Sequence, residues 1–266
     1  MKRMFMPASF STALLITSLV IFIFYNFAFI FALLKKRNDI ADIAWGIGFL
    51  IATICPLFLY GIHSQRSIIA TALIFIWSTR LSLHIYKRNS GKTEDYRYLA
   101  WRNEWGRYFY IRTYLQVFLL QAIFLIIIVT PVLLINSNQR QGITWLDLIG
   151  IAVWIFGFIF ETIADHQLAT FLSNSNNQGL ILTKGLWHYS RHPNYFGEIT
   201  LWWGFFILAL SVKGGIFSII SPITITYLII KVSGIPLLEK KMAENTAFKK
   251  YKEQTSALIP WMRKNQ

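Results

Sequence analysis

The sequence predicts an all-α protein that crosses a membrane about seven times. Three observations predict this: 55% of the 266 residues are hydrophobic, only 14% are charged, and several long stretches carry no charge. A soluble protein of this size cannot bury so much apolar surface, and a chain inside a bilayer satisfies its backbone hydrogen bonds by forming helices. The composition also excludes a disordered chain and a collagen-like chain, and the single cysteine excludes a disulfide scaffold.

The first predicted span, 10–34, has no charged residue and is followed by three cations. It is longer than the apolar region of a signal peptide and lacks a small-x-small cleavage site, so we expect a retained helix. About 20 apolar residues cross a bilayer as a helix. By this criterion, six more spans are predicted at 43–62, 68–86, 114–136, 145–165, 195–212 and 215–231. We expect residues 1–266 to form a single transmembrane domain.

The basic residues are distributed unevenly between the predicted loops. Of the 26 Lys and Arg residues, 20 fall on one side of the membrane and five on the other, while Arg80 lies within a span. Cations collect on the cytoplasmic side, which predicts an external N-terminus and a cytoplasmic C-terminus. The net charge of +14 therefore chiefly reflects topology and attraction to anionic lipids. We expect no nucleic-acid partner and no metal site, because the motifs and ligand sets of both are missing.

Ionisable residues inside predicted spans are candidates for function, because they are costly in a bilayer. Arg80, Glu161, Asp165 and Glu198 meet this criterion. Glu161 and Asp165 are four residues apart and therefore share one face of a helix. They could hold a polar ligand by its hydroxyl or amide groups, or form an ion-pair cluster with Arg80 that serves assembly alone.

The motif GLWHYSRHPNYFGE, residues 185–198, places many hydrogen-bonding side chains at the predicted start of the sixth span. Pro193 favours a first helical turn, and Arg191 is suited to bidentate phosphate contacts. Asn194 and Glu198, four residues apart, could grip an amide or a hydroxyl. A chance interfacial loop would hold the aromatic residues but seldom this density of polar groups. The motif therefore predicts a ligand site.

This motif, the preceding E-x-x-x-D pair and the following Trp-Trp-Gly resemble the C-terminal domain of the steroid 5α-reductase family. The resemblance covers roughly residues 35–262 and includes the tail sequence ALIP at 257–260. The segments DIAWG, 42–46, and RLSLH, 80–84, are similar to the bacterial branch. The resemblance implies seven transmembrane helices and an NADPH-dependent reductase of a conjugated C=C bond in a lipid or steroid-like substrate. It also implies location in a bacterial inner membrane.

By position, the resemblance implies that Asp165, Asn194 and Glu198 hold the nicotinamide nucleotide. Glu161 stands where the best-studied members have an amide residue. The remaining cofactor-binding residues are expected to be Arg80, Arg191, His192 and Tyr195. The cationic loop containing Arg97, Arg102 and Arg107 is expected either to close over the cofactor phosphates or to be a solvated interfacial loop.

The resemblance also implies a catalytic group on the second helix. Asp42 falls near the family carboxylate that polarises the substrate carbonyl, and a carboxyl donor would have to be protonated, which a dry site favours. Trp77 stands where the family has a tyrosine, and it can donate a hydrogen bond but cannot deliver a proton as a phenol does. Trp45 is expected to shape the pocket of an apolar substrate that enters from the bilayer.

Two other functions stay open at this point. The pattern R-H-P-x-Y-x-G also occurs in membrane isoprenylcysteine methyltransferases, which use S-adenosylmethionine. Those enzymes usually carry paired glutamates in their late segment, whereas Glu239 is followed here by Lys240. The other alternative is a non-enzymatic membrane protein or transporter.

Overall fold

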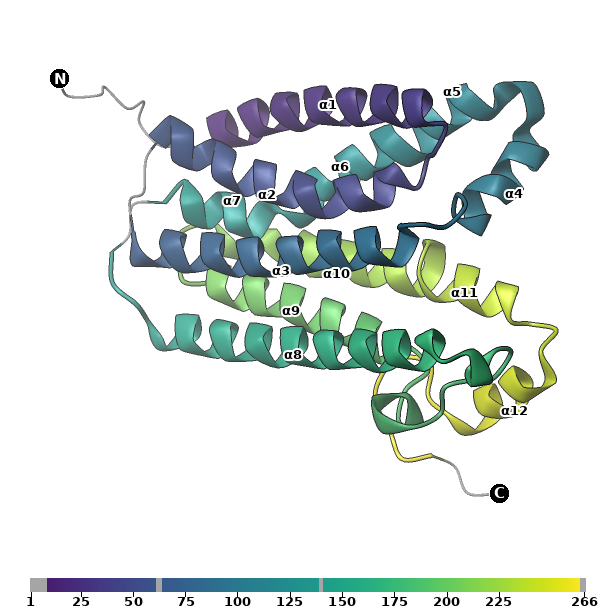
Figure 1. Ribbon diagram of the computed structural model, residues 1–266. Coiled ribbons are helices and arrows are strands. Elements are labelled where there is room, and N and C mark those ends of the chain that lie inside the picture. The colour runs from purple at the N-terminus through teal and green to yellow at the C-terminus, as the bar shows by residue number, and fades with distance from the viewer. Residues whose placement is uncertain (1–8, 61–63, 139–140, 264–266) are drawn as a thin grey trace. The chain divides into compact units, whose positions relative to one another are not determined.

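The computed structural model describes residues 9–60, 64–138 and 141–263, and it is all-helical there, as predicted (Figure 1). The isolated bridge between Ser190 and Ser256 is the only extended pairing in these ranges. The end of the second predicted span, at residue 62, lies outside the described residues. So do four cations used in the charge distribution, Lys2, Arg3, Arg140 and Lys264.

Six helical segments of the described chain are long and apolar enough to cross a membrane. They are Phe10–Lys35, Ile40–Leu59, Gln65–Asn89, Tyr96–Ile128, Trp145–Ser173 and Gly215–Lys241. This is the architecture of an integral membrane protein, and the number is close to the predicted seven. The remaining predicted span, 195–212, corresponds to α9, Pro193–Ala209, whose 17 residues are near the lower limit for crossing a bilayer. The orientation of the termini stays a prediction.

Several helices are longer than the apolar stretches that predicted them. α8, Trp145–Ser173, continues beyond the predicted end at residue 165. The predicted third loop is largely helical, with α4 at Tyr96–Trp105 and α5 at Phe109–Thr113. A π-helical turn at Tyr114–Leu119 leads into α6, Leu120–Ile128, and α7 follows at Thr130–Asn136. Hydropathy detects only the apolar part of a helix, so it misses polar turns that continue past the apolar stretch.

The chain divides into two compact units. The first unit comprises Met1–Thr144 with Ala209–Ser218, and the second comprises Trp145–Leu208 with Ile219–Gln266. The single transmembrane domain expected from the sequence stays a prediction.

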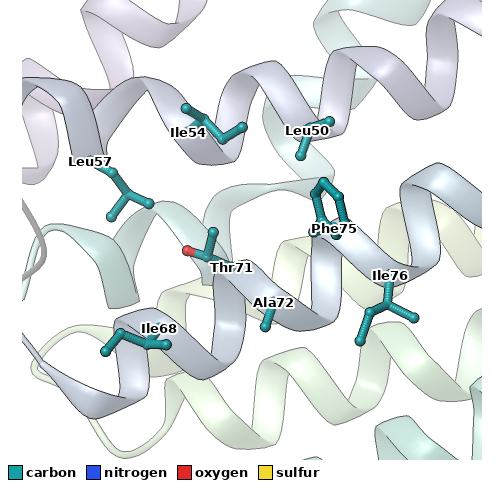
Figure 2. Close-up of a pocket in the computed structure, with 8 residues that line it drawn as sticks. All are labelled: Leu50, Ile54, Leu57, Ile68, Thr71, Ala72, Phe75 and Ile76. Atoms are coloured by element: carbon teal, nitrogen blue, oxygen red, sulfur yellow. The ribbon is translucent and has the colours of Figure 1, made fainter.

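In the first unit, α1, Phe10–Lys35, packs against α2, Ile40–Tyr60, and α2 packs against α3, Gln65–Asn89 (Figure 1). Gly46 permits close approach of α2 and α3, because a Cβ atom there would lie 2.9 Å from the Ser78 carbonyl oxygen. Elsewhere these two helices leave an apolar groove of about 460 Å³, shown in Figure 2. Thr71 supplies the one polar side chain of its lining, so the groove contains no acid or base for chemistry.

In the second unit, α8 and α9 lie side by side and contact each other through glycines (Figure 1). A Cβ atom on Gly157 would lie 2.5 Å from the Leu201 nitrogen and 2.7 Å from the Gly197 carbonyl oxygen. The same kind of contact recurs seven residues along each helix, where Gly150 meets Gly204. The two pairs run in opposite directions along the chain, so the helices are antiparallel. Small residues allow such backbone contact between membrane helices.

The rest of the second unit follows α9 in sequence. α10, Ile220–Tyr227, continues through a π-helical turn at Leu228–Val232, and α11 spans Ile235–Lys241. α12, Thr246–Gln254, is capped by Asn245, whose side chain accepts a hydrogen bond from the Phe248 nitrogen. This cap satisfies a backbone donor that the first helical turn leaves open.

Candidate functional site

The glycine contact between α8 and α9 assembles the polar residues of the second unit. Glu161 and Asp165 both lie on a buried face of α8, as their spacing predicted. The Gly197 backbone lies directly against Glu161, because a Cβ atom on Gly197 would be 2.5 Å from the Glu161 nitrogen. One turn earlier on α9, the Asn194 Nδ2 atom donates a hydrogen bond of 3.1 Å to Asp165 Oδ1. Residues far apart in sequence thus form one cluster.

Asn194 presents an unused hydrogen-bond acceptor to this cluster. Its Nδ2 atom faces Asp165, so its Oδ1 atom points the other way. That oxygen is buried and accepts no hydrogen bond from the part of the chain that is described. A buried amide oxygen without a donor is costly, and such groups in native proteins call for an explanation. A ligand that supplies an amide N–H or a hydroxyl would satisfy it.

Two further predicted residues lie on the first turns of α9. Tyr195 stacks on His192, with ring centroids 5.6 Å apart and an angle of 18° between the planes. Glu198 is half-buried, one turn after Asn194. The predicted set Asp165, Asn194 and Glu198 therefore occupies facing parts of two helices that are in contact.

Arg191, which was predicted to contact phosphate, bonds acceptors of the chain itself, and its cofactor role stays a prediction. It is buried, and its Nε and Nη2 atoms donate to Glu239 Oε1 at 2.9 and 2.7 Å. Its Nη1 atom donates to the carbonyl oxygens of Lys252, at 3.1 Å, and Thr255. The guanidinium is thus directed at acceptors on α11 and at the C-terminal end of α12. His192 Nε2 lies 3.4 Å from the same Glu239 oxygen.

The loop before α9 is fixed to α8. The Trp187 indole donates to the Ala164 carbonyl oxygen at 3.1 Å, and the Leu186 nitrogen donates to Gln167 Oε1 at 3.0 Å. Gly185 has a φ of +64°, and a Cβ atom there would meet the Gln167 amide at 2.6 Å. The positive φ favours glycine at position 185, and any larger residue there would also displace the Gln167 amide.

The C-terminal segment holds the same loop from the other side. The Tyr251 hydroxyl donates to the Trp187 carbonyl oxygen, and burial raises the pKa of Tyr251, so this donor keeps its proton. Ser190 Oγ donates to the Leu258 carbonyl oxygen at 2.8 Å, and the Trp261 nitrogen donates to the Tyr189 carbonyl oxygen at 3.0 Å. These bonds explain why the tail belongs with the motif although it is distant in sequence.

Asp42, the predicted catalytic residue, lies in the first turn of α2 in the first unit. Its Oδ2 atom is 2.5 Å from the Arg97 guanidinium, and its Oδ1 atom accepts a hydrogen bond of 3.0 Å from the Tyr98 hydroxyl. Both carboxyl oxygens of Asp42 are therefore engaged by side chains of α4, and its catalytic role stays a prediction. Arg97 also bonds Asp95, where burial works to raise the carboxyl pKa but Arg97 outweighs it and lowers that pKa.

The other predicted residues of the first unit lie along α2 and α3. Trp77 is fully buried and packs edge-on against Phe49, which in turn packs edge-on against Trp45. Arg80 lies on α3, one turn after Trp77. The roles of Trp45, Trp77 and Arg80 stay predictions. In the described ranges, no cluster of His, Cys, Asp or Glu could hold a metal ion.

In the cationic loop of the first unit, Arg97 and Arg102 form ion pairs with acidic residues. Arg102 pairs with Glu94 at 3.0 Å, as Arg97 does with Asp42. Glu94 Oε1 also accepts from the Asn38 nitrogen at 2.6 Å, so it joins the α1–α2 connection to the α3–α4 connection. Both connections were predicted on the same side of the membrane, and their contact agrees with that topology.

Comparison with known proteins places this architecture in a family. The model of the family described as protein of unknown function (DUF1295) matches residues 28–255, most of the chain. The chain belongs to this family. DUF1295 is a steroid 5α-reductase-like family, so the resemblance drawn from the motif is confirmed.

Individual relatives of this DUF1295 protein match over shorter stretches. An uncharacterized protein of Schizosaccharomyces pombe is 27% identical over 172 residues, which are 56% of this chain and 49% of that protein. Human 3-oxo-5-alpha-steroid 4-dehydrogenase 1 is 34% identical over 71 residues, or 27% of each chain. The mouse enzyme of the same name is 32% identical over 72 residues, or 27% of this chain and 28% of the enzyme. The chain thus spans half or less of these curated relatives, and no solved structure matches it.

Sequence reasoning missed three residues around the candidate sites of this DUF1295 protein. Glu239 was noted only as half of a missing glutamate pair. Neither Tyr251 nor Tyr98 was singled out. An acidic residue or a tyrosine among apolar residues indicates a buried polar side chain that needs a hydrogen-bond partner. The sequence does not show which residue that partner is.

Proposed function

We propose that this protein is a membrane-embedded, NADPH-dependent reductase of a conjugated C=C bond in a lipid or steroid-like substrate. The membrane reductase class is supported by the family and by the names of the mammalian relatives. The observation that carries the cofactor proposal is the Asp165–Asn194 pair, whose Asn194 Oδ1 is buried and accepts no hydrogen bond within the described chain. A nicotinamide carboxamide or a ribose hydroxyl has the donor that this oxygen needs.

The chain's own groups have distinct tasks in this proposal. Asp165 fixes the direction of the Asn194 amide through the 3.1 Å hydrogen bond. Carboxylates accept hydrogen bonds only, so Glu161 and Glu198 suit hydroxyl and amide donors. Tyr195 contributes an aromatic face beside them. A bound reduced nicotinamide would supply the hydride, while the protein supplies orientation and electrostatics.

In the first unit, the proposed polarising group is Asp42 together with Tyr98. The Asp42 carboxyl group is paired with Arg97, and the Tyr98 hydroxyl donates a hydrogen bond to it. Charge that develops on a substrate carbonyl oxygen is stabilised by such a donor. Trp77 and Trp45 would provide apolar surroundings.

A binding titration tests the cofactor proposal. The purified protein in detergent is titrated with NADPH and separately with S-adenosylmethionine, since the R-H-P-x-Y-x-G pattern also occurs in methyltransferases. We expect NADPH to bind, and Asn194→Ala to weaken its binding by about tenfold or more, because a hydrogen bond from the ligand to a buried amide oxygen is lost. Asn176→Ala, in an exposed loop of the same unit, is the matched control. Binding of S-adenosylmethionine but not of NADPH would overturn the proposal, as would unchanged affinity in Asn194→Ala.

A further inference from the structure

The contacts of Arg191 indicate a role that the motif does not suggest. Its side chain is 7% exposed, and that of Glu239 is 11% exposed. The pair is made by two guanidinium atoms on one carboxylate oxygen, and the third guanidinium nitrogen bonds carbonyl oxygens of Lys252 and Thr255. A charge-assisted interaction in such a setting is stronger and more directional than one at the surface.

Arg191 lies directly before the residues of the candidate site in the chain. The Arg191 nitrogen donates to the Ser256 carbonyl oxygen at 2.8 Å, and the His192 nitrogen donates to Ser190 Oγ at 3.1 Å. α9 begins at the next residue, Pro193, and Asn194 follows. The position of the Asn194 amide opposite Asp165 therefore depends on where the Arg191 side chain is anchored.

The Glu239 carboxylate contacts three basic side chains. Its Oε1 atom faces Arg191 and His192, and its Oε2 atom lies 2.7 Å from Lys252 Nζ. Lys252 is 55% exposed, so its share of the interaction is screened by solvent. Arg191 and His192 are the buried partners, and both belong to the motif.

We propose that Glu239 is a positioning residue of the nucleotide site. By holding Arg191 and His192, it fixes the beginning of α9 and so the alignment of Asn194 with Asp165. Arg191 is then an anchor of the protein and not a phosphate ligand. The inference rests on the proposed function for its ligand, but the anchor itself exists without nucleotide.

A double-mutant cycle separates the anchor from a phosphate ligand. NADPH affinity is measured for Glu239→Gln, Arg191→Gln and the double variant, each corrected for the fraction of binding-competent protein. If the two residues act as one anchor, each single variant weakens NADPH binding by about tenfold or more, and the double variant is no weaker than either. If Arg191 binds phosphate, Glu239→Gln frees it and leaves the affinity unchanged or raised, and that result would overturn the proposal. Glu244→Gln removes an exposed carboxylate nearby and is the matched control.

Hydrogen exchange on the nucleotide-free protein gives the second readout. Glu239→Gln is expected to speed exchange of the amides of Arg191 and Trp261, which bond across the motif and the tail. Exchange as slow as in the wild type would also refute the anchor. Failure of the wild type to bind NADPH would sink the proposed function alone, because exchange would still show whether Glu239 holds the motif. A purely structural role would lower the folded fraction but leave the Kd of the folded molecules unchanged, and would likewise count against the proposal.

Discussion

The close contact of α8 and α9 leads to a specific prediction for Gly157→Ala. The new methyl carbon would lie 2.5 Å from the Leu201 nitrogen and 2.7 Å from the Gly197 carbonyl oxygen. Both are backbone atoms that cannot rotate away, and ordinary contacts are about 3.5 Å or longer. The helices must therefore separate by about 1 Å at this point.

Two opposing free energies decide the effect of Gly157→Ala on stability. Overpacking costs about 1–3 kcal/mol, whereas alanine favours a helix over glycine by about 1 kcal/mol. The net loss in the free energy of unfolding is about 0–2 kcal/mol. The nucleotide site is more sensitive, because a shift that breaks the 3.1 Å alignment of Asn194 with Asp165 costs a buried hydrogen bond of about 1–3 kcal/mol, or roughly 5- to 150-fold in affinity.

The assay compares thermal unfolding in detergent with NADPH affinity. Gly150→Ala makes a similar backbone contact, 2.7 Å from the Leu208 nitrogen, but about two helical turns farther from Asp165. We expect Gly150→Ala to lower stability comparably and affinity much less than Gly157→Ala. Ala152→Val adds atoms on an exposed face of α8 and is the control for bulk alone. If Gly157→Ala binds NADPH as tightly as Ala152→Val does, the reasoning from backbone contact is refuted.

Three further substitutions test individual contacts. Glu94→Gln should lower the free energy of unfolding by about 1–3 kcal/mol, because it neutralises a buried carboxylate that accepts hydrogen bonds from charged and neutral donors. The control Glu104→Gln changes an exposed carboxylate and should leave the free energy of unfolding unchanged. Equal melting temperatures of the two variants would contradict this prediction. Asp42→Asn should break the Arg97 ion pair and reduce turnover more than nucleotide affinity, and an unchanged kcat would remove Asp42 from the proposed chemistry. Tyr251→Phe should cost about 1 kcal/mol at neutral pH. Because the folded-state pKa of Tyr251 is raised, its contribution is complete below the ordinary pKa of about 10 and is lost as the pH rises above it, so the two melting curves should converge in alkali; a constant difference would contradict this.

The sequence predicted the helical membrane architecture because apolar length is a local property. The face shared by Glu161 and Asp165 followed from their spacing in the same way. The end of α8 was set too early, since its last turns are polar and hydropathy does not register them. The glycines at 150 and 157 could be read from the sequence, but their meaning depends on knowing which helix lies opposite.

The ion-pair partners of the charged residues could not be predicted from sequence patterns. Arg191 looked available for phosphate because its partner, Glu239, is 48 residues away, with no periodic signal between them. Asp42 was predicted to be a catalytic group, and the pattern did not reveal that Arg97, 55 residues away, pairs with it. A pairing of this kind is set by tertiary packing, so a count of cations in a loop does not show which of them are already neutralised.

Transfer of a labelled hydride tests the central claim most directly. Membranes containing the protein are supplied with NADPH that carries deuterium at C4 of the nicotinamide and with a lipid extract, and the lipids are then examined by mass spectrometry. With the wild-type protein we expect a lipid that gains one deuterium from the cofactor and one hydrogen from water, and we expect no such product with Asn194→Ala. Binding of NADPH without any lipid acquiring the label, together with methyl transfer from S-adenosylmethionine, would contradict it.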